Sequence, residues 1–117
     1  RYGSEEQKRR WLPPMAAGEV IGCFGLTEPD FGSNPAGMRT SARRDGDDWV
    51  LNGTKCWITT AGEPTWYTVM AVTDPARGKK GVSAFILEKG MPGFAAGPPY
   101  RKLGLHASDT AAVIEKK

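Results

Sequence analysis

The sequence contains little of the chemistry that binds metals or titrates near neutral pH: one histidine and two cysteines among 117 residues. Cys23 and Cys56 do not form a Cys-x-x-Cys pair, and His106 has no second ligand at a metal-binding spacing. We therefore predict no metal site and no catalytic role for His106. Both cysteines stand in apolar, strand-like segments. This favours reduced thiols in a reducing compartment, with a disulfide between the two segments as the alternative.

Long apolar runs are also missing. No run approaches the ~20 residues of a membrane-spanning helix, and the first residues, RYGSEEQ, lack the apolar core of a secretory signal. The sequence thus predicts a soluble protein that is not secreted and has no membrane span. The net charge is +3, but the basic residues form scattered clusters without interleaved aromatic residues. We expect no nucleic-acid partner, while attraction to a phosphate-rich small molecule stays open.

The familiar nucleotide and calcium motifs are absent as well. The chain has neither a Gly-x-Gly-x-x-Gly pattern nor a Walker motif, so we expect no Rossmann or P-loop site. Asp45, Asp47 and Asp48 could be imagined around calcium, but no glutamate follows them at the spacing of an EF-hand. A hairpin turn is the better interpretation of this acidic stretch.

Turn-forming residues, by contrast, are abundant: the chain has fifteen glycines and nine prolines. Between them lie short segments rich in β-branched and aromatic residues, which predict strands. The predicted strands are Val20–Thr27, Met38–Arg44, Trp49–Leu51, Thr54–Thr60, Trp66–Thr73, Val82–Glu88 and Ala111–Glu115. Asn52-Gly53 predicts a turn or a bulge between two of them. Many short strands of this kind favour a mainly β fold, an antiparallel barrel or sandwich.

The N-terminal residues predict one short helix. Ser4 and Gln7 have the spacing of a capping box, and the prolines Pro13-Pro14 predict the end of the helix near Leu12. We expect residues 1–17 to be the end of a helical region cut off upstream. Residues 18–117 then form the β domain.

Two segments carry the chemistry of interest, CFGLTEPDFGSN (residues 23–34) and KCWITT (residues 55–60). Each is interpreted as a strand that delivers a threonine hydroxyl at its end, Thr27 in the first and Thr59 in the second. Gly32-Ser33 forms a loop that suits a phosphate, and the Trp57 indole can cover a flat ring. Taken singly, the threonines could satisfy backbone groups, the glycine and serine could form a plain turn, and the indole could lie in the core. Together they are what a flavin dinucleotide requires.

Three segments in order, CFGLTEPDFGSN, LNGTKCWITT and KLGLHASDT, resemble the middle β-domain of the acyl-CoA dehydrogenase family. The resemblance spans nearly the whole chain. GCFGLTEP and LEKGMPG lean towards the glutaryl-CoA dehydrogenase branch, whereas KLGLHASDT is closer to the general branch. Membership implies FAD as cofactor and α,β-dehydrogenation of an acyl-CoA thioester, with hydride passing to flavin N5. It also implies an electron-transfer flavoprotein as acceptor, a homotetrameric or homodimeric parent, and a bacterial cytoplasmic or mitochondrial matrix location.

The resemblance also implies residue roles. The Thr27 hydroxyl would donate to the N1/O2 edge of the flavin, Thr59 would bond near N5, and Trp57 would pack against the ring system. The remaining contacts are the backbone of Phe24, Leu26 and Ile58 around the pocket, Gly32 and Ser33 at the pyrophosphate, and Ser33 also near the acyl-CoA. The family's catalytic carboxylate belongs to a C-terminal helical domain that this chain does not contain. No catalytic residue is therefore assigned, and Glu28 is given a structural role.

Two further readings stay open at this point. One is an oxidase or flavin monooxygenase of the same superfamily, and the other is a non-enzymatic β-barrel interaction domain that has lost its cofactor. Four residues also depart from the family pattern. Thr60 replaces a common asparagine, and Phe31 replaces a small residue in the loop before Ser33. Asn34 replaces an acidic residue, and His106 stands where an arginine is common.

Overall fold

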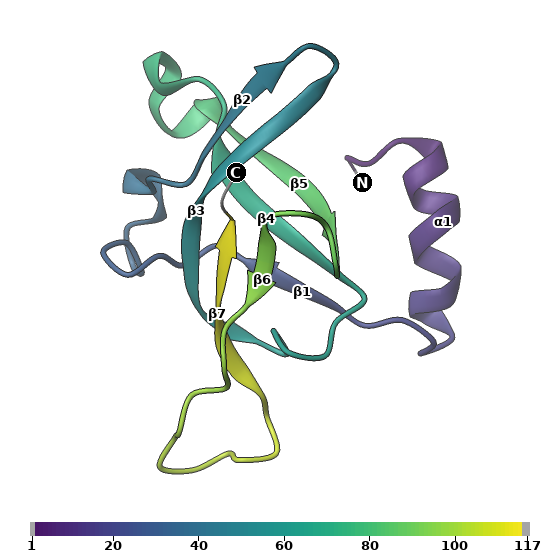
Figure 1. The fold of residues 1–117 in the computed structure, drawn as a ribbon. Coiled ribbons are helices and arrows are strands. Elements are labelled where there is room, and N and C mark those ends of the chain that lie inside the picture. Colours follow the sequence, from purple (N-terminus) through teal and green to yellow (C-terminus); the bar gives the residue numbers. More distant parts are fainter. Residues whose placement is uncertain (1, 116–117) are drawn as a thin grey trace.

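The computed structural model describes residues 2–115, and within this range the chain is mostly strand (Figure 1). One α-helix precedes seven strands and two short 3-10 helices. The elements are α1 (Glu5–Ala16), β1 (Gly22–Gly25), η1 (Pro35–Gly37), β2 (Ser41–Asp45), β3 (Asp48–Thr59), β4 (Trp66–Val72), η2 (Pro75–Gly81), β5 (Val82–Glu88), β6 (Phe94–Ala96) and β7 (Thr110–Glu115). The predicted mainly β fold with a short N-terminal helix is confirmed.

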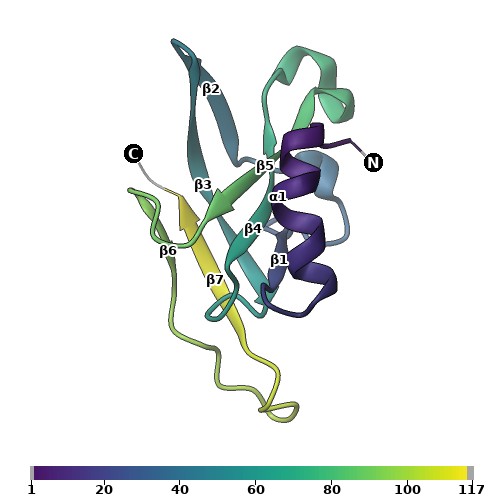
Figure 2. The same ribbon diagram turned by 90° about the vertical axis from the view of Figure 1, so that its right-hand side faces the viewer.

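The strands form one curled sheet in the order β1-β4-β2-β3-β7-β6, with β5 also paired to β4 (Figures 1 and 2). β3 is the long strand that joins two parts of this sheet: residues 48–52 pair with β2, and residues 53–59 pair with β7. Most pairs are antiparallel, but β1 runs parallel to β4. A parallel pair needs a long crossover, and here the β2–β3 hairpin lies within that crossover. The sheet is therefore mixed rather than wholly antiparallel.

The core lies inside the curl and draws on the inward faces of β3, β4 and β7. Its buried members are Ile58, Ala61, Tyr67, Val69, Ala111 and Val113. The hydroxyl of Tyr67 donates to the carbonyl of Ala61 at 2.8 Å, so the one polar atom of this ring is satisfied. Phe94 of β6 packs edge-on against the Tyr67 ring at 4.5 Å between centroids. β6 has only three residues and was not predicted, since so short a segment shows no alternation.

The predicted turn or bulge at Asn52-Gly53 is wrong, because β3 continues through both residues. The glycine has a packing role instead. A Cβ at Gly53 would lie 2.6 Å from Cβ of Thr40, whose side chain is buried beside the strand. Glycine therefore allows a close approach here. The other predicted turn, at Gly46-Asp47 between β2 and β3, is confirmed.

The N-terminal helix also extends beyond its predicted end. The capping box of Ser4 and Gln7 is present, but the helix runs through Pro13 and Pro14 to Ala16. Proline cannot donate a backbone hydrogen bond, but the carbonyls of Pro13 and Pro14 still accept hydrogen bonds from Ala17 and Glu19 respectively. One further turn therefore forms.

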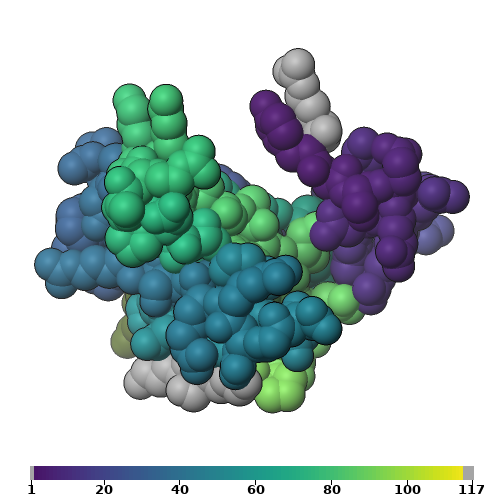
Figure 3. Space-filling model, turned by 90° about the horizontal axis from the view of Figure 1, so that it is seen from above, coloured from purple at the N-terminus to yellow at the C-terminus, as the bar shows by residue number. Residues whose placement is uncertain are grey.

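The helix lies beside the sheet, with a hollow between it and the β2–β3 hairpin (Figure 3). Its buried residue, Trp11, packs on Trp66 of β4 at 5.6 Å between ring centroids. Arg10 forms an ion pair of 2.7 Å with Glu88 at the end of β5. No helix among residues 2–115 is long and apolar enough to cross a bilayer. The boundary between a helical region and the β domain at residue 17 remains a prediction.

Candidate functional site

The two segments singled out in the sequence meet in the structure. After β1 the chain passes β3, where the backbone N–H of Cys56 donates to the carbonyl of Thr27 at 2.9 Å. Thr27 therefore lies across from the residue that precedes Trp57. We call the residues Leu26–Glu28 and Lys55–Thr59 the strand-end corner.

A β-bulge shapes the β3 side of the corner. The pairing of β3 with β7 shifts between Lys55 and Ile58, and Trp57 within the bulge has a φ of 58°. A positive φ costs a bulky residue energy, and such outliers gather at functional sites. The bulge leaves 64% of Trp57 exposed. The alternative of a core indole is therefore wrong.

Beyond the bulge, inward and outward side chains alternate again. Ile58 is buried in the core, whereas Thr59, the last residue of β3, is exposed. The sequence prediction needs only the backbone of Ile58 at a pocket, so its buried side chain is compatible with that prediction. Trp57 and Thr59 thus present an indole and a hydroxyl to the exterior from one strand.

One side of the indole is occupied from within the chain. The ring of Tyr100 lies 4.6 Å from the Trp57 ring between centroids, at an interplanar angle of 51°. Tyr100 belongs to the segment of residues 97–109, which projects from the sheet between β6 and β7 (Figure 1). We call this segment the β6–β7 loop.

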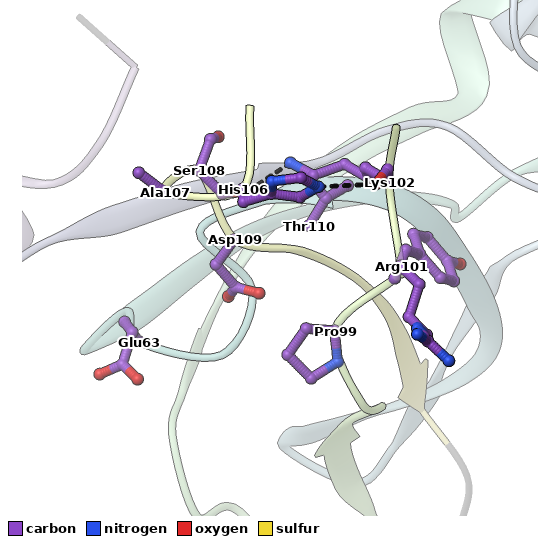
Figure 4. Close-up of a pocket in the computed structure, with 10 residues that line it drawn as sticks. Glu63, Pro99, Arg101, Lys102, His106, Ala107, Ser108, Asp109 and Thr110 are labelled. Carbon is purple, nitrogen blue, oxygen red and sulfur yellow. Dashed lines mark hydrogen bonds between the residues drawn. The ribbon is translucent and has the colours of Figure 1, made fainter. Parts of the chain in front are cut away.

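The β6–β7 loop borders an open pocket of about 560 Å³ (Figure 4). Nε2 of His106 lies 2.8 Å from the carbonyl oxygen of Lys102. The Lys102 ammonium donates to the Ser108 carbonyl and to the Thr110 hydroxyl. Asp109 accepts a hydrogen bond from the backbone of Gly62. Two charged groups of this pocket, Lys102 and Asp109, therefore each bind polar groups of the chain itself. His106 makes a contact within the loop, and the absence of a catalytic role stays a prediction.

The Thr27 side of the corner is held by a buried ion pair that the sequence did not reveal. The Lys55 ammonium lies 2.9 Å from a carboxylate oxygen of Glu28, and the two side chains are 0% and 5% exposed. Lys55 also donates to the carbonyl of Leu26 at 3.2 Å. An alternation pattern marks Lys55 only as an inward position of β3, which a lysine rarely occupies without a partner. A lysine at an inward position of a strand is therefore the feature of the sequence that could have indicated a buried acidic partner.

The surroundings of Glu28 favour its ionised form. Burial alone would raise its pKa, but hydrogen bonds from the backbone N–H of Arg39 and Thr40 and from Lys55 outweigh burial and hold the pKa below its usual value. A carboxylate that is buried and already paired cannot remove a proton from a substrate. The structural role expected for Glu28 agrees with this geometry.

The predicted phosphate loop follows directly from Glu28. The backbones of Glu28 and Phe31 exchange two hydrogen bonds of 3.1 and 3.2 Å, and Gly32 and Ser33 come next, both exposed. A Cβ added to Gly32 would meet only the methyl group of Thr27, at 4.0 Å, so packing within the described chain does not demand glycine. The ring of Phe31, the residue before Gly32, packs against Gly37.

On β1, the side chains alternate in the same way as on β3. Phe24 is 55% exposed, while Cys23 packs on the core and Leu26 is half-buried after the strand ends. The corner therefore holds Thr27 next to Gly32, while Trp57 and Thr59 lie on the outward side of β3. Phe24 lies on the outward side of the neighbouring strand.

Comparison with known proteins adds to this geometry. The family profile described as "Acyl-CoA dehydrogenase, middle domain" matches residues 23–117. The chain belongs to the acyl-CoA dehydrogenase family. The match includes both sides of the strand-end corner and all of the sheet except Gly22.

Three relatives illustrate the similarity. The probable acyl-CoA dehydrogenase fadE25 of Mycobacterium leprae is 55% identical over 98% of this chain and 30% of its own length. The human mitochondrial short-chain specific acyl-CoA dehydrogenase is 47% identical, over 97% and 28%. A crystal structure of a Mycobacterium smegmatis glutaryl-CoA dehydrogenase in complex with FADH2 is 58% identical, with a TM-score of 0.91, over 99% and 29%. The chain thus spans about 30% of the length of these acyl-CoA dehydrogenases.

The two thiols of this family member are free in the structure. Burial raises the pKa of Cys23 to about 11. Burial also raises the pKa of Cys56, and the nearby Glu28 carboxylate raises it further. Since the thiolate is the reactive form, both cysteines act as packing residues in this acyl-CoA dehydrogenase domain.

Proposed function

We propose that this chain is the flavin- and acyl-CoA-binding part of an FAD-dependent acyl-CoA dehydrogenase. The observation that carries the proposal is the exposed Trp57 indole, held in a strained bulge beside two threonines. Nothing in the described chain covers it fully, and a flat ring system would. The match to the middle domain of the family supports the same assignment.

The residues present suit a flavin dinucleotide. Thr27 and Thr59 each offer a hydroxyl donor, and Trp57 offers an apolar plate. Gly32 and Ser33 form an exposed loop that begins next to Thr27. The backbone of Phe24, Leu26 and Ile58 would complete the wall. Bound FAD would supply the acceptance of hydride from the β-carbon of an acyl-CoA thioester. Fixed donors of this kind stabilise developing negative charge without reorganising.

The chain's own part in the reaction is binding and orientation. Glu28 is paired in the interior and therefore does not serve as the base. We expect the α-proton to be removed by a carboxylate outside this chain. Ser33 would contact the acyl-CoA, an electron-transfer flavoprotein would accept the electrons, and the parent would be a homodimer or homotetramer in a bacterial cytoplasm or a mitochondrial matrix.

A chimaera tests the proposal in a complete enzyme. Residues 1–117 would replace the matching stretch of the Mycobacterium smegmatis glutaryl-CoA dehydrogenase, which is 58% identical. We expect the purified chimaera to retain FAD and to lose the visible absorbance of oxidised flavin when an acyl-CoA is added without oxygen. A folded chimaera that retains no FAD would refute the proposal.

Single substitutions in the chimaera test the assigned residues. Trp57→Ala and Thr59→Val should each weaken FAD binding, for the hydroxyl by about 1 kcal/mol, or about five-fold. Thr65→Val, on an exposed threonine outside the corner, is the matched control. Unchanged FAD affinity in both corner variants would favour the interaction-domain reading. Rapid oxygen consumption without an added acceptor would favour the oxidase or monooxygenase reading.

A further inference from the structure

We propose that Lys55 is a positioning residue of the strand-end corner: its ammonium group fixes the Thr27 hydroxyl relative to the Trp57 indole. The inference rests on the proposed flavin site, since a ligand would contact Thr27 and Trp57 and not the buried Lys55. It concerns how the site is built.

Three successive residues on the Thr27 side are tied to two successive residues of β3. The Lys55 ammonium donates to the carbonyl of Leu26 at 3.2 Å and to the carboxylate of Glu28 at 2.9 Å, one on each side of Thr27. The Cys56 N–H donates to the carbonyl of Thr27 itself at 2.9 Å. Trp57 is the next residue. Any shift of Thr27 relative to Trp57 must therefore break or stretch one of these bonds.

Stability alone is a poor reason for a lysine at this position. Both ions lose hydration on burial, and an apolar pair of similar volume often stabilises a fold as well or better. What lysine adds is direction, because one ammonium carries three N–H donors. Here two of them reach oxygens on opposite sides of Thr27, and Sδ of Met38 lies 3.9 Å from the same nitrogen.

The same ion pair also reaches the predicted phosphate loop. The two carboxylate oxygens of Glu28 accept hydrogen bonds from the backbone of Arg39 at 2.6 Å and of Thr40 at 2.8 Å. The backbone of Glu28 closes the turn with Phe31 that leads into Gly32-Ser33. Lys55 thus sits between the threonine that would meet the flavin ring and the loop that would meet its phosphates.

The decisive variant replaces both ions, Glu28→Gln/Lys55→Met, so that no buried charge is left unpaired. In the chimaera described above, we expect FAD to bind at least about five-fold more weakly than in the unsubstituted chimaera, as for the loss of one hydrogen bond. The matched control is Glu5→Gln/Lys8→Met, which removes an exposed ion pair of the same chemistry on α1. It should leave FAD affinity unchanged.

A mutant cycle separates positioning from a merely structural role. Thr27→Val removes the hydroxyl, and we expect this to weaken FAD binding about five-fold in the unsubstituted chimaera. In the Glu28→Gln/Lys55→Met background, the additional effect of Thr27→Val should shrink towards none, because the hydroxyl is already misplaced. Equal effects of Thr27→Val in both backgrounds would overturn the proposal.

A measurement without FAD distinguishes this inference from the proposed function. In the 117-residue chain, the double variant should move the amide NMR signals of Leu26, Thr27 and Trp57 while those of β5 stay in place. Unmoved signals at Thr27 and Trp57 would overturn the role of Lys55 even where FAD binds. Moved signals would support that role even where the chimaera fails to retain FAD. Lys55→Gln, which keeps a shorter N–H donor, replaces the double variant where that variant does not fold, with the same expected shifts.

Discussion

Trp57 belongs to the strand-end corner and contacts the β6–β7 loop, yet the protein holds these two regions in place by different means. In the corner, a buried ion pair and a strand-to-strand hydrogen bond fix Thr27. The loop meets Trp57 through Tyr100 and leaves Leu103 and Leu105 almost fully exposed. The Thr27 side of the corner is therefore fixed by contacts within this chain, whereas the loop keeps two apolar side chains, Leu103 and Leu105, that nothing in residues 2–115 covers. The candidate flavin contact Thr27 thus lies where a buried ion pair and a backbone hydrogen bond tie two strands together.

The largest expected effect comes from breaking the ion pair on one side. Glu28→Gln leaves the buried Lys55 charge without its partner and should lower the free energy of unfolding by about 3 kcal/mol or more. Urea unfolding measures the change. Glu5→Gln, in the exposed pair with Lys8, should change stability by less than about 0.5 kcal/mol. A loss below about 1 kcal/mol for Glu28→Gln would show that the corner is not held by this pair.

A second effect compares a packed glycine with an open one. Gly53→Ala places a methyl group against the buried Thr40 side chain and should cost about 2 kcal/mol. Gly104→Ala in the β6–β7 loop meets nothing within 4 Å and is the matched control. Thermal unfolding of both variants measures the difference. Equal melting temperatures would contradict the close approach at β3.

Acid should weaken the corner. Because the pKa of Glu28 is lowered in the folded state, its contribution to stability is fully present above the unfolded value of about 4.3 and is lost as pH falls through the folded pKa. This effect should be no larger than that of Glu28→Gln, since both changes remove the negative charge beside Lys55 and both leave a carbonyl oxygen that accepts hydrogen bonds. Urea unfolding at several pH values measures it. The Glu28→Gln variant should show a shallower decline in acid, and an identical decline would contradict the assignment.

A smaller effect, of opposite sign, is expected at the end of the bulged strand. Thr60 has a φ of 64°, a conformation that asparagine tolerates and a β-branched residue does not. Thr60→Asn should therefore raise the free energy of unfolding by about 0.5 to 1 kcal/mol. Thr54→Asn, within β3 where φ is not positive, should not stabilise. A destabilised Thr60→Asn variant would show that the hydroxyl has a role that outweighs the strain.

The smallest effect belongs to the loop itself. Leu103→Ser should change stability by less than about 0.5 kcal/mol, because the side chain is exposed and buries nothing within this chain. Urea unfolding of the 117-residue chain measures it. A loss above about 1 kcal/mol would mean that the loop is folded against the domain.

Much of the fold could be predicted from local patterns. β5 has the predicted bounds, and the hairpin at Gly46-Asp47 follows from its turn residues. The failures have separate causes. Gly53 signals a turn but accommodates Thr40, and the prolines of α1 signal an end although their carbonyls still accept hydrogen bonds. β6 is too short to carry a periodic signal.

The candidate site divides in the same way. The residue types at Thr27, Trp57 and Thr59 indicated a flavin site because hydroxyls at strand ends and an indole suit a flat, polar-edged ring. Their mutual placement depends on contacts distant in sequence: the Lys55–Glu28 ion pair, the Cys56–Thr27 hydrogen bond and the register shift against β7. No short-range pattern encodes such contacts.

The sequence by itself determined the β character of this protein, its family and the residue types of its site, because periodicity, turn residues and motifs are local properties. Only the tertiary structure decided that Trp57 faces outward, that Glu28 is paired rather than free, and that Lys55 lies between Leu26 and Glu28. These depend on which strands pair and in what register, and a shift of one residue in a strand turns every side chain to the other face.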